Sequence, residues 1–197
     1  MREFMHFGQV ANFKTNSNIE ISKIPYALNS NLPNSIVIKK AEEVPERFHS
    51  RYNCTGKTYK YVINNNEFPS ALERYREFHI PNKLNYNDMK KALTYFEGTH
   101  DFVGFKSSGG APKKTTARTI KKATITKSKD GRFVITLSGD GFLYNMVRII
   151  AGTIIDVGLG KIDVNDIPRI IESKDRKQAG KTLPPHGLYL VEVFYES

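Results

Sequence analysis

An arginine stands in the middle of the most apolar stretch of the sequence. The stretch is GFLYNMVRIIAGTIIDVG, residues 141–158, and the arginine is Arg148. A guanidinium stays charged in proteins, and burying a charge without a partner is costly. Arg148 therefore either extends to solvent from a half-buried position or lies inward, ready to bind a carboxylate or a phosphate. On a helix its neighbours at four-residue spacing are Tyr144 and Gly152, and Gly152 leaves room for another backbone or a substrate.

A second stretch alternates cations with aromatic rings. In RFHSRYNCTGKTYKY, residues 47–61, the cations could hold phosphates while ring faces stack on bases. The residues that we single out from this pattern are His49, Arg51, Lys57 and Tyr59. The alternative for Tyr59 is core packing, because it shares a strand face with Tyr61 and Ile63.

A further basic run crosses a loop rich in Gly, Ser and Lys at 106–118 and enters the next predicted strand. Its members are Lys113, Lys114, Arg118, Lys121, Lys122, Lys127 and Lys129. These residues either contact RNA or form the solvated edge of a hairpin, where lysines discourage aggregation. The net charge of +10, from 30 Lys and Arg against 20 Asp and Glu, suits a polyanionic partner such as nucleic acid.

Several other kinds of chemistry are not indicated. A single cysteine excludes an internal disulfide and a multi-cysteine zinc site, and the five histidines lack metal-ligand spacing. GKT at 56–58 copies the end of a phosphate-binding loop, but the first glycine of that loop would fall on Arg51. The apolar run 142–157 is too short and too polar to span a membrane. MREFMHFGQV lacks the apolar core of a signal peptide, so we expect a cytoplasmic protein without a membrane partner.

The elements that must position these residues follow from periodicity and turn signals. The pattern predicts strands at 8–13, 35–44, 56–65 and 187–197, and helices at 21–33, 141–158 and 164–176. Within 84–102 it predicts a further helix, which starts with an asparagine as the candidate cap and ends at Gly98. Residues 117–141 read as a hairpin with Asp130-Gly131 as its turn. Within it, strict alternation puts Ile120 and Ile125 on opposite faces, so neither face is purely apolar. The mixture of elements and the hairpin indicate an α+β fold on an antiparallel sheet.

A set of segments, read in order from residue 7 to residue 190, resembles the TruA-type tRNA pseudouridine synthase A family. The segments are FGQVANF, ALNSNLPNSI, FHSRYNCTGKTYKYVI, GTHDFVGF, TTARTI, GDGFLYNMVRIIAGTIIDVG and AGKTLPPHGLYL. Each is weak alone, but together in register they are specific. The resemblance implies an extended antiparallel sheet with helices packed on one side. It also implies two α/β halves around a basic cleft, with 1–52 as a remnant of the first half and 53–197 as the second.

The resemblance further implies an enzyme that isomerises uridine to pseudouridine in the anticodon stem-loop of tRNA, as a homodimer and without a metal or organic cofactor. The target nucleotide leaves its stack before its glycosidic bond breaks. Tyr59 matches the family's tyrosine beside the target base, and Arg148 matches the arginine that pairs with the catalytic aspartate. We expect His49 and Arg51 to join them in binding the substrate. The residues expected to contact the rest of the RNA are Lys57, Lys113, Lys114 and Arg118.

The sequence departs from the family where the nucleophile should stand. In the family, a segment resembling GRTDAGVHAxGQV carries the aspartate, and its place in this chain falls on Met1. We therefore assign no catalytic residue and expect a chain without the family's first section. Asp140, which precedes Arg148 in the same segment, is a candidate replacement ion-pair partner. The alternative to an active enzyme is a catalytically inactive remnant that still binds tRNA.

Overall fold

The chain forms two compact units. The computed structural model describes residues 5–110 and 114–196. One unit contains the residues up to Gln9 together with the chain from Cys54 onward, and the other is Val10–Asn53. The interpretation of 1–52 as a remnant of an N-terminal half stays a prediction.

The Val10–Asn53 unit has little regular structure. A short 3₁₀ helix, Ile21–Lys23, leads into α1, Ile24–Asn29, so the helix expected at 21–33 is present but ends early. The strand expected at 35–44 is wrong. The amide of Asn29 donates to the carbonyl of Ile38 at 2.9 Å and accepts from its N–H at 2.7 Å. This side chain therefore takes the place that a neighbouring strand would occupy.

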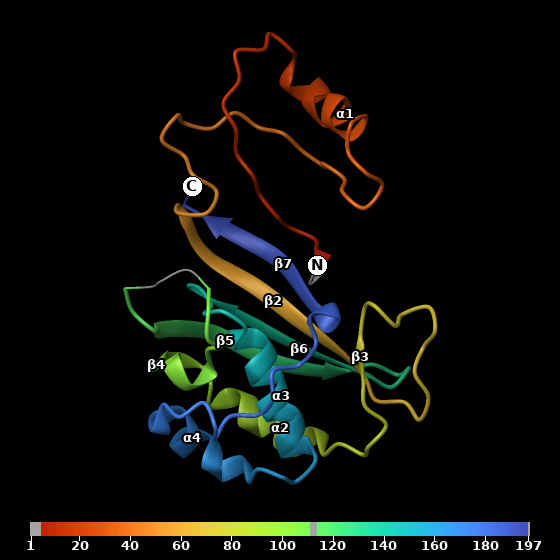
Figure 1. Cartoon of the computed structure of the whole chain (residues 1–197), viewed down its shortest axis with the longest axis vertical. Helices are drawn as coiled ribbons and strands as arrows, with labels where there is room; N and C mark the ends of the chain where they lie inside the picture. The colour runs from red at the N-terminus through yellow and green to blue at the C-terminus, as the bar shows by residue number, and fades with distance from the viewer. Residues whose placement is uncertain (1–4, 111–113, 197) are drawn as a thin grey trace. The chain divides into compact units, whose positions relative to one another are not determined.

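The larger unit is built on a seven-stranded sheet with the order β1-β7-β2-β6-β5-β4, in which β3 also pairs with β2 (Figure 1). The strands are β1 Met5–His6, β2 Cys54–Asn64, β3 Phe78–His79, β4 Gly98–Asp101, β5 Ala117–Lys127, β6 Arg132–Gly139 and β7 Leu188–Tyr195. The long strands pair antiparallel, as expected, while the two-residue strands β1 and β3 pair parallel. The strand expected at 8–13 is wrong, because pairing stops just after Phe7 donates to the carbonyl of Leu190.

A bulge in β5 explains why its sequence fits no single alternating face. The register between β5 and β6 shifts between Ile120 and Lys122, which inserts one extra residue. After the shift, the alternation of side chains between the two faces of the sheet is reversed. Ile120, Ala123 and Ile125 are therefore all buried on the same face. Both lysines at 121 and 122 remain exposed. The expectation that Ile120 and Ile125 lie on opposite faces is therefore wrong.

The core lies on one face of the sheet, and the helices cover it. Tyr61, Ile135 and Ile125 stand side by side on β2, β6 and β5 and are buried. The helices α2 Tyr86–Thr94, α3 Met146–Gly158 and α4 Ile167–Ser173 contribute Met89, Leu93, Ile150, Ile154 and Ile170 to the same cluster. The predicted α+β fold is thus confirmed. No helix in the part of the chain that the structure describes is long and apolar enough to cross a membrane.

Local signals set the ends of the predicted elements. The side chain of Asn85 accepts hydrogen bonds from the N–H groups of Asn87 and Asp88 at the start of α2, which confirms the predicted cap. Gly131, in the predicted hairpin turn, has a φ of 81°. By contrast, α3 begins at Met146 rather than near 141, because Asn145 is in the left-handed region with a φ of 63°.

Candidate functional site

The segment 179–184 crosses α3 in close contact beside Arg148. A Cβ atom at Gly152 would lie 2.0 Å from the carbonyl oxygen of Lys181, so only glycine fits this position. The next helical residue, Thr153, accepts a hydrogen bond from the N–H of Gly180 at 2.9 Å. The expectation that Gly152 admits the close approach of another backbone is therefore confirmed.

Arg148 is half-buried, and two of its hydrogen bonds go to neutral oxygen atoms. Its Nε donates to the carbonyl of Leu183 at 2.6 Å, and its Nη1 donates to Oδ1 of Asn145 at 2.7 Å. The N–H of Leu183 in turn donates to the carbonyl of Arg148 at 3.3 Å. Because a guanidinium has only donors, two acceptors on different nitrogen atoms fix the plane of the group. These two bonds orient the guanidinium group.

Two tyrosines of β2, Tyr59 and Tyr61, lie on the core face of the sheet. Tyr59 is half-buried, and its ring meets the edge of Phe142 with centroids 5.2 Å apart. Burial raises the pKa of the Tyr59 hydroxyl, and the nearby Cys54 adds to the rise. Tyr61 is fully buried and donates to the carbonyl of Pro184 at 2.8 Å. Its pKa is raised by burial, while the Arg148 charge acts in the opposite direction. Both tyrosines stay neutral hydroxyls, and Tyr59 keeps part of its surface exposed.

His186 completes the group of side chains around Arg148. It lies in the 3₁₀ helix Pro185–Gly187, which leads into β7. Burial lowers the pKa of this imidazole, the positive charge of Arg148 lowers it further, and a hydrogen bond with the backbone of Glu77 raises it. The Arg148 guanidinium therefore acts electrostatically on both Tyr61 and His186.

We expect His186 to titrate below 6.5, its ordinary pKa, and its pKa to rise in an Arg148→Gln variant, because a repelling charge is removed. The lowered pKa means that protonation favours the unfolded chain. The stabilisation from neutral His186 is complete above pH 6.5 and is lost as the pH falls toward the folded-state pKa. Proton NMR titration of the imidazole measures both effects. An unchanged pKa in Arg148→Gln, with Arg169→Gln as the control, would contradict this placement.

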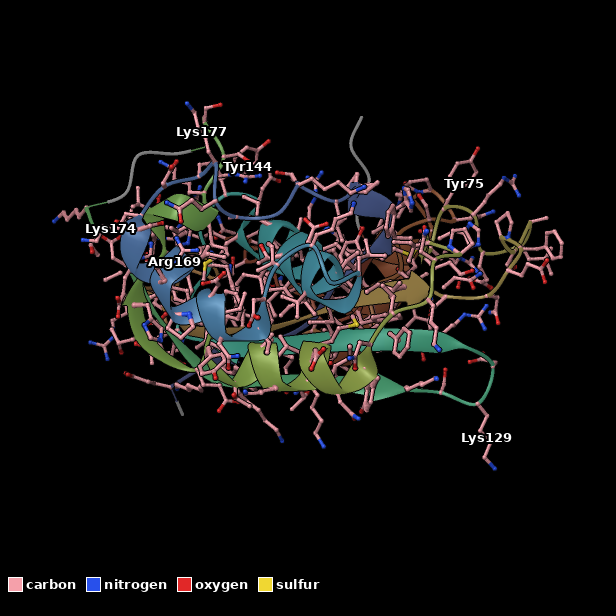
Figure 2. The ribbon with its side chains drawn as sticks, turned by 90° about the horizontal axis from the view of Figure 1, so that it is seen from below. Tyr75, Lys129, Tyr144, Arg169, Lys174 and Lys177 are labelled. Atoms are coloured by element: carbon pink, nitrogen blue, oxygen red, sulfur yellow. The ribbon has the colours of Figure 1, made fainter. Side chains whose placement is uncertain are left out.

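Of the described residues expected to contact RNA, Lys57 lies on β2, Arg118 on β5 and Lys114 in the loop before β5. Lys57 is half-buried on β2, opposite Gly139 of β6 and Val193 of β7. Arg118 on β5 donates to the carbonyl of Thr115 at 3.0 Å. Lys114 is exposed, and Lys113 lies outside the described residues, as does part of the loop at 106–118. Figure 2 shows Lys129 extending from the tip of the β5–β6 hairpin, with Lys174 and Lys177 at the other end of the unit.

His49 and Arg51 belong to the Val10–Asn53 unit, separate from Tyr59 and Arg148. The two residues do lie together. Nδ1 of His49 accepts from the N–H of Arg51 at 3.1 Å, and both side chains contact the ring of Tyr52. Their expected role in substrate binding remains a prediction, because the structure places them in a different unit.

Asp140 is not the replacement partner that the sequence suggested. Its carboxylate accepts from the N–H of Thr119 at 3.0 Å, and its own N–H donates to the carbonyl of Thr119. It thereby closes the end of the β5–β6 pair, and among the described residues no ion pair joins it to Arg148. Met1, where the family aspartate would fall, lies outside the described residues. Within the described ranges, no group of three or more His, Cys, Asp or Glu side chains could hold a metal ion.

Sequence reasoning missed the residues that hold Arg148. The Leu183 carbonyl lies 35 positions away in the chain. Every residue has a backbone carbonyl, so residue type does not indicate which one accepts a hydrogen bond. Asn145 did carry a signal, because asparagine is among the few residues that tolerate the left-handed region. Placed just before an arginine-bearing helix, it marked a turn that could deliver its side chain to that arginine.

The sequence model of a family described as "tRNA pseudouridine synthase" matches residues 92–196, which include β5, β6, α3 and Arg148. This chain belongs to that family of isomerases. "tRNA pseudouridine synthase A" from Acetivibrio thermocellus is 53% identical over 188 residues, which are 95% of this chain and 76% of the relative. Proteins of the same name from Ruminiclostridium cellulolyticum and Caldicellulosiruptor saccharolyticus are 50% and 51% identical, over 96% and 95% of this chain and 77% and 76% of theirs.

Proposed function

We propose that this chain acts in the isomerisation of uridine to pseudouridine in tRNA, with target nucleotides in the anticodon stem-loop. The relatives that it matches over nearly its whole length are named as tRNA pseudouridine synthases. The observation that carries the proposal is an oriented cation close to the strand face that also carries a partly exposed aromatic ring. Tyr59 offers a partly exposed ring on the same strand face as Tyr61, and Arg148 lies close enough to Tyr61 to act on its pKa.

The reaction balances without an oxidant or a reductant. The bond between N1 of the base and C1′ of the sugar breaks, and a bond between C5 and C1′ forms. The hydrogen of C5 leaves as a proton to water, and N1 takes up a proton. The protein must therefore hold the base through a rotation and stabilise the charge that develops, which are tasks for a ring face and for fixed hydrogen-bond donors.

In this proposal Tyr59 lies against the target base and Arg148 binds an anion beside it. A guanidinium whose plane is fixed in advance binds a carboxylate or a phosphate with directed, charge-assisted hydrogen bonds. Burial raises the pKa of the Tyr59 hydroxyl, so the side chain stays neutral. A neutral tyrosine can lie against a base and does not repel the phosphates of the RNA. No residue of this chain is assigned as the nucleophile, because the place of the family aspartate falls on Met1.

Basic residues supply the rest of the RNA contact in the proposal. Lys57, Lys113, Lys114 and Arg118 are assigned to phosphates, and His49 and Arg51 to binding of the substrate. The formal charge of +10 supports an electrostatic contribution to tRNA binding. The proposal includes a homodimer and a cytoplasmic location, as the resemblance implies. Light scattering of the purified chain tests the dimer by its mass.

Two assays on the purified chain test the proposed function. Filter binding with unmodified tRNA should show an affinity that falls steeply with salt, because phosphate contacts release counterions. Absent or salt-independent binding would contradict the proposal. In the second assay, tRNA labelled with tritium at C5 of uridine reports turnover by tritium release. The chain alone is expected to release almost none.

A peptide carrying the family segment GRTDAGVHA forms the second arm of the release assay. Tritium release only when this peptide is added would support the assignment of Tyr59 and Arg148 to a competent site. Binding without release in both arms would favour the inactive tRNA-binding alternative. Clear release by residues 1–197 alone would contradict the statement that this chain supplies no nucleophile.

A further inference from the structure

Asn145 connects Arg148 to a loop on the far side of the turn before α3. Its Oδ1 accepts from Nη1 of Arg148 at 2.7 Å, and its Nδ2 donates to Oγ of Ser107 at 3.0 Å. The N–H of Ser107 also donates to the carbonyl of Tyr144 at 3.2 Å. The turn at 144–145 is therefore attached to the loop that follows the 3₁₀ helix Phe102–Phe105 by two neighbouring hydrogen bonds.

The chemistry of these groups permits one orientation of the Asn145 amide. A guanidinium has only donors, so the amide oxygen must face Arg148 and the amide nitrogen must face away. The Ser107 hydroxyl lies where it accepts from that nitrogen. Ser107 thus supplies an acceptor for the amide nitrogen in the orientation that Arg148 requires.

The backbone at this position also points to a role for the side chain. Asn145 has a φ of 63° and a ψ of 6°, a conformation that glycine adopts without strain and that costs other residues free energy. A residue chosen only for the turn would be glycine. Asparagine is less favourable than glycine in this backbone conformation, but it places an amide between Arg148 and Ser107.

We propose that Asn145 is a positioning residue for Arg148 and that Ser107 positions Asn145 in turn. This inference rests on the proposed function, which assigns Arg148 to an anion beside the target uridine. Asn145 and the Leu183 carbonyl bind different nitrogen atoms of the guanidinium, so together they fix its plane. The arginine is then oriented before RNA arrives, and its hold depends on the loop that carries Ser107.

Three variants distinguish the contribution of the Asn145 side-chain amide from that of its left-handed backbone conformation. Asn145→Gly keeps the left-handed turn without strain and removes the side chain. Asn145→Asp keeps an acceptor oxygen for Arg148, and the Ser107 hydroxyl can donate to its other oxygen. Ser107→Ala removes the hydroxyl that accepts from the amide nitrogen. The matched control is Asn165→Gly, which deletes an exposed amide that accepts from Lys91 on a different surface.

The readout is solvent exchange of the Arg148 Nε proton by NMR in the full chain, with the signal assigned from its absence in Arg148→Lys. We expect Asn145→Gly to speed this exchange about tenfold. Without the bond from Nη1 to Asn145 the plane of the guanidinium is no longer fixed, so the bond from Nε to Leu183 opens more often. Ser107→Ala should give a smaller increase, while Asn145→Asp and Asn165→Gly should match the parent chain. Unchanged backbone signals away from 105–108 and 142–149 show that the fold is retained.

Parent-like exchange in Asn145→Gly would overturn the proposal, and so would equally fast exchange in Asn145→Gly and Asn145→Asp. The same variants are then tested for tRNA binding, which separates the two proposals. Contact to the target uridine is measured by photo-crosslinking from 4-thiouridine in the anticodon stem-loop. Faster exchange of the Arg148 Nε proton with unchanged crosslinking would support the positioning by Asn145 and contradict the role assigned to Arg148. Weaker crosslinking to the target uridine, with Arg148 Nε exchange as in the parent chain, would overturn the positioning by Asn145.

Discussion

Replacing Gly152 with alanine is expected to lower the free energy of unfolding by about 3 kcal/mol. The new Cβ would lie 2.0 Å from the carbonyl oxygen of Lys181 and 3.1 Å from its carbon, and both are backbone atoms that cannot rotate away. The segment cannot retreat easily, because the N–H of Gly180 donates to Thr153. The helix cannot retreat either, because Ile150 and Ile154 are buried in the core. Urea denaturation of the purified chain measures the loss.

Gly141→Ala is the matched control for this prediction. The atoms nearest to its added Cβ are Nε and Cδ of the Arg118 side chain at 3.6 and 3.7 Å, which is ordinary contact. We expect a change within about 0.5 kcal/mol, as for a substitution that creates no clash. A loss below about 1 kcal/mol in Gly152→Ala would show that the 179–184 segment yields readily, contrary to its close packing on α3.

An Arg148→Gln variant is expected to bind tRNA almost as tightly as the parent chain but to lose contact with the target uridine. Most of the affinity comes from phosphate contacts spread over many lysines and arginines, so removing one cation changes it by less than about threefold. Photo-crosslinking from 4-thiouridine in the anticodon stem-loop to peptides of β2 should fall about tenfold, because a directed charge-assisted interaction at the base is lost.

Arg169→Gln provides the control for a lost charge alone. Arg169 lies on the exposed side of α4 and pairs with Asp166 at 3.2 Å. Its replacement removes one cation without touching the group around Arg148, so crosslinking to β2 should be unchanged. Equal losses in both variants would mean that Arg148 contributes only general charge, and the role proposed for it would be wrong.

The sequence predicted the elements whose signals are local. The Asn85 cap, the hairpin turn at Asp130-Gly131 and the alternation of β2 each depend on neighbouring residues, and each is confirmed. The strand expected at 35–44 failed because its backbone bonds to the side chain of Asn29. The β5 bulge was likewise hidden, since a one-residue register shift is decided by the pairing with β6.

The candidate site was predictable only where a residue contradicted its surroundings. Arg148 could be singled out because a charge in an apolar helix demands an explanation. The hydrogen-bond acceptors of Arg148 could not be singled out from the sequence. The Leu183 carbonyl is brought to Arg148 by the tertiary fold, and the Asn145 side chain by a left-handed turn. Interleaved cations and rings suggested one binding surface, but His49 and Arg51 belong to a different unit from Tyr59.

The most direct test of the account is the crosslinking map of the parent chain itself. tRNA with 4-thiouridine in the anticodon stem-loop is irradiated with the purified protein, and the joined peptides are identified by mass spectrometry. We expect the crosslinks to reach the β2 peptide that contains Tyr59, and we expect excess unlabelled tRNA to abolish them. Crosslinks confined to the β5–β6 hairpin, with none on β2, would contradict this expectation.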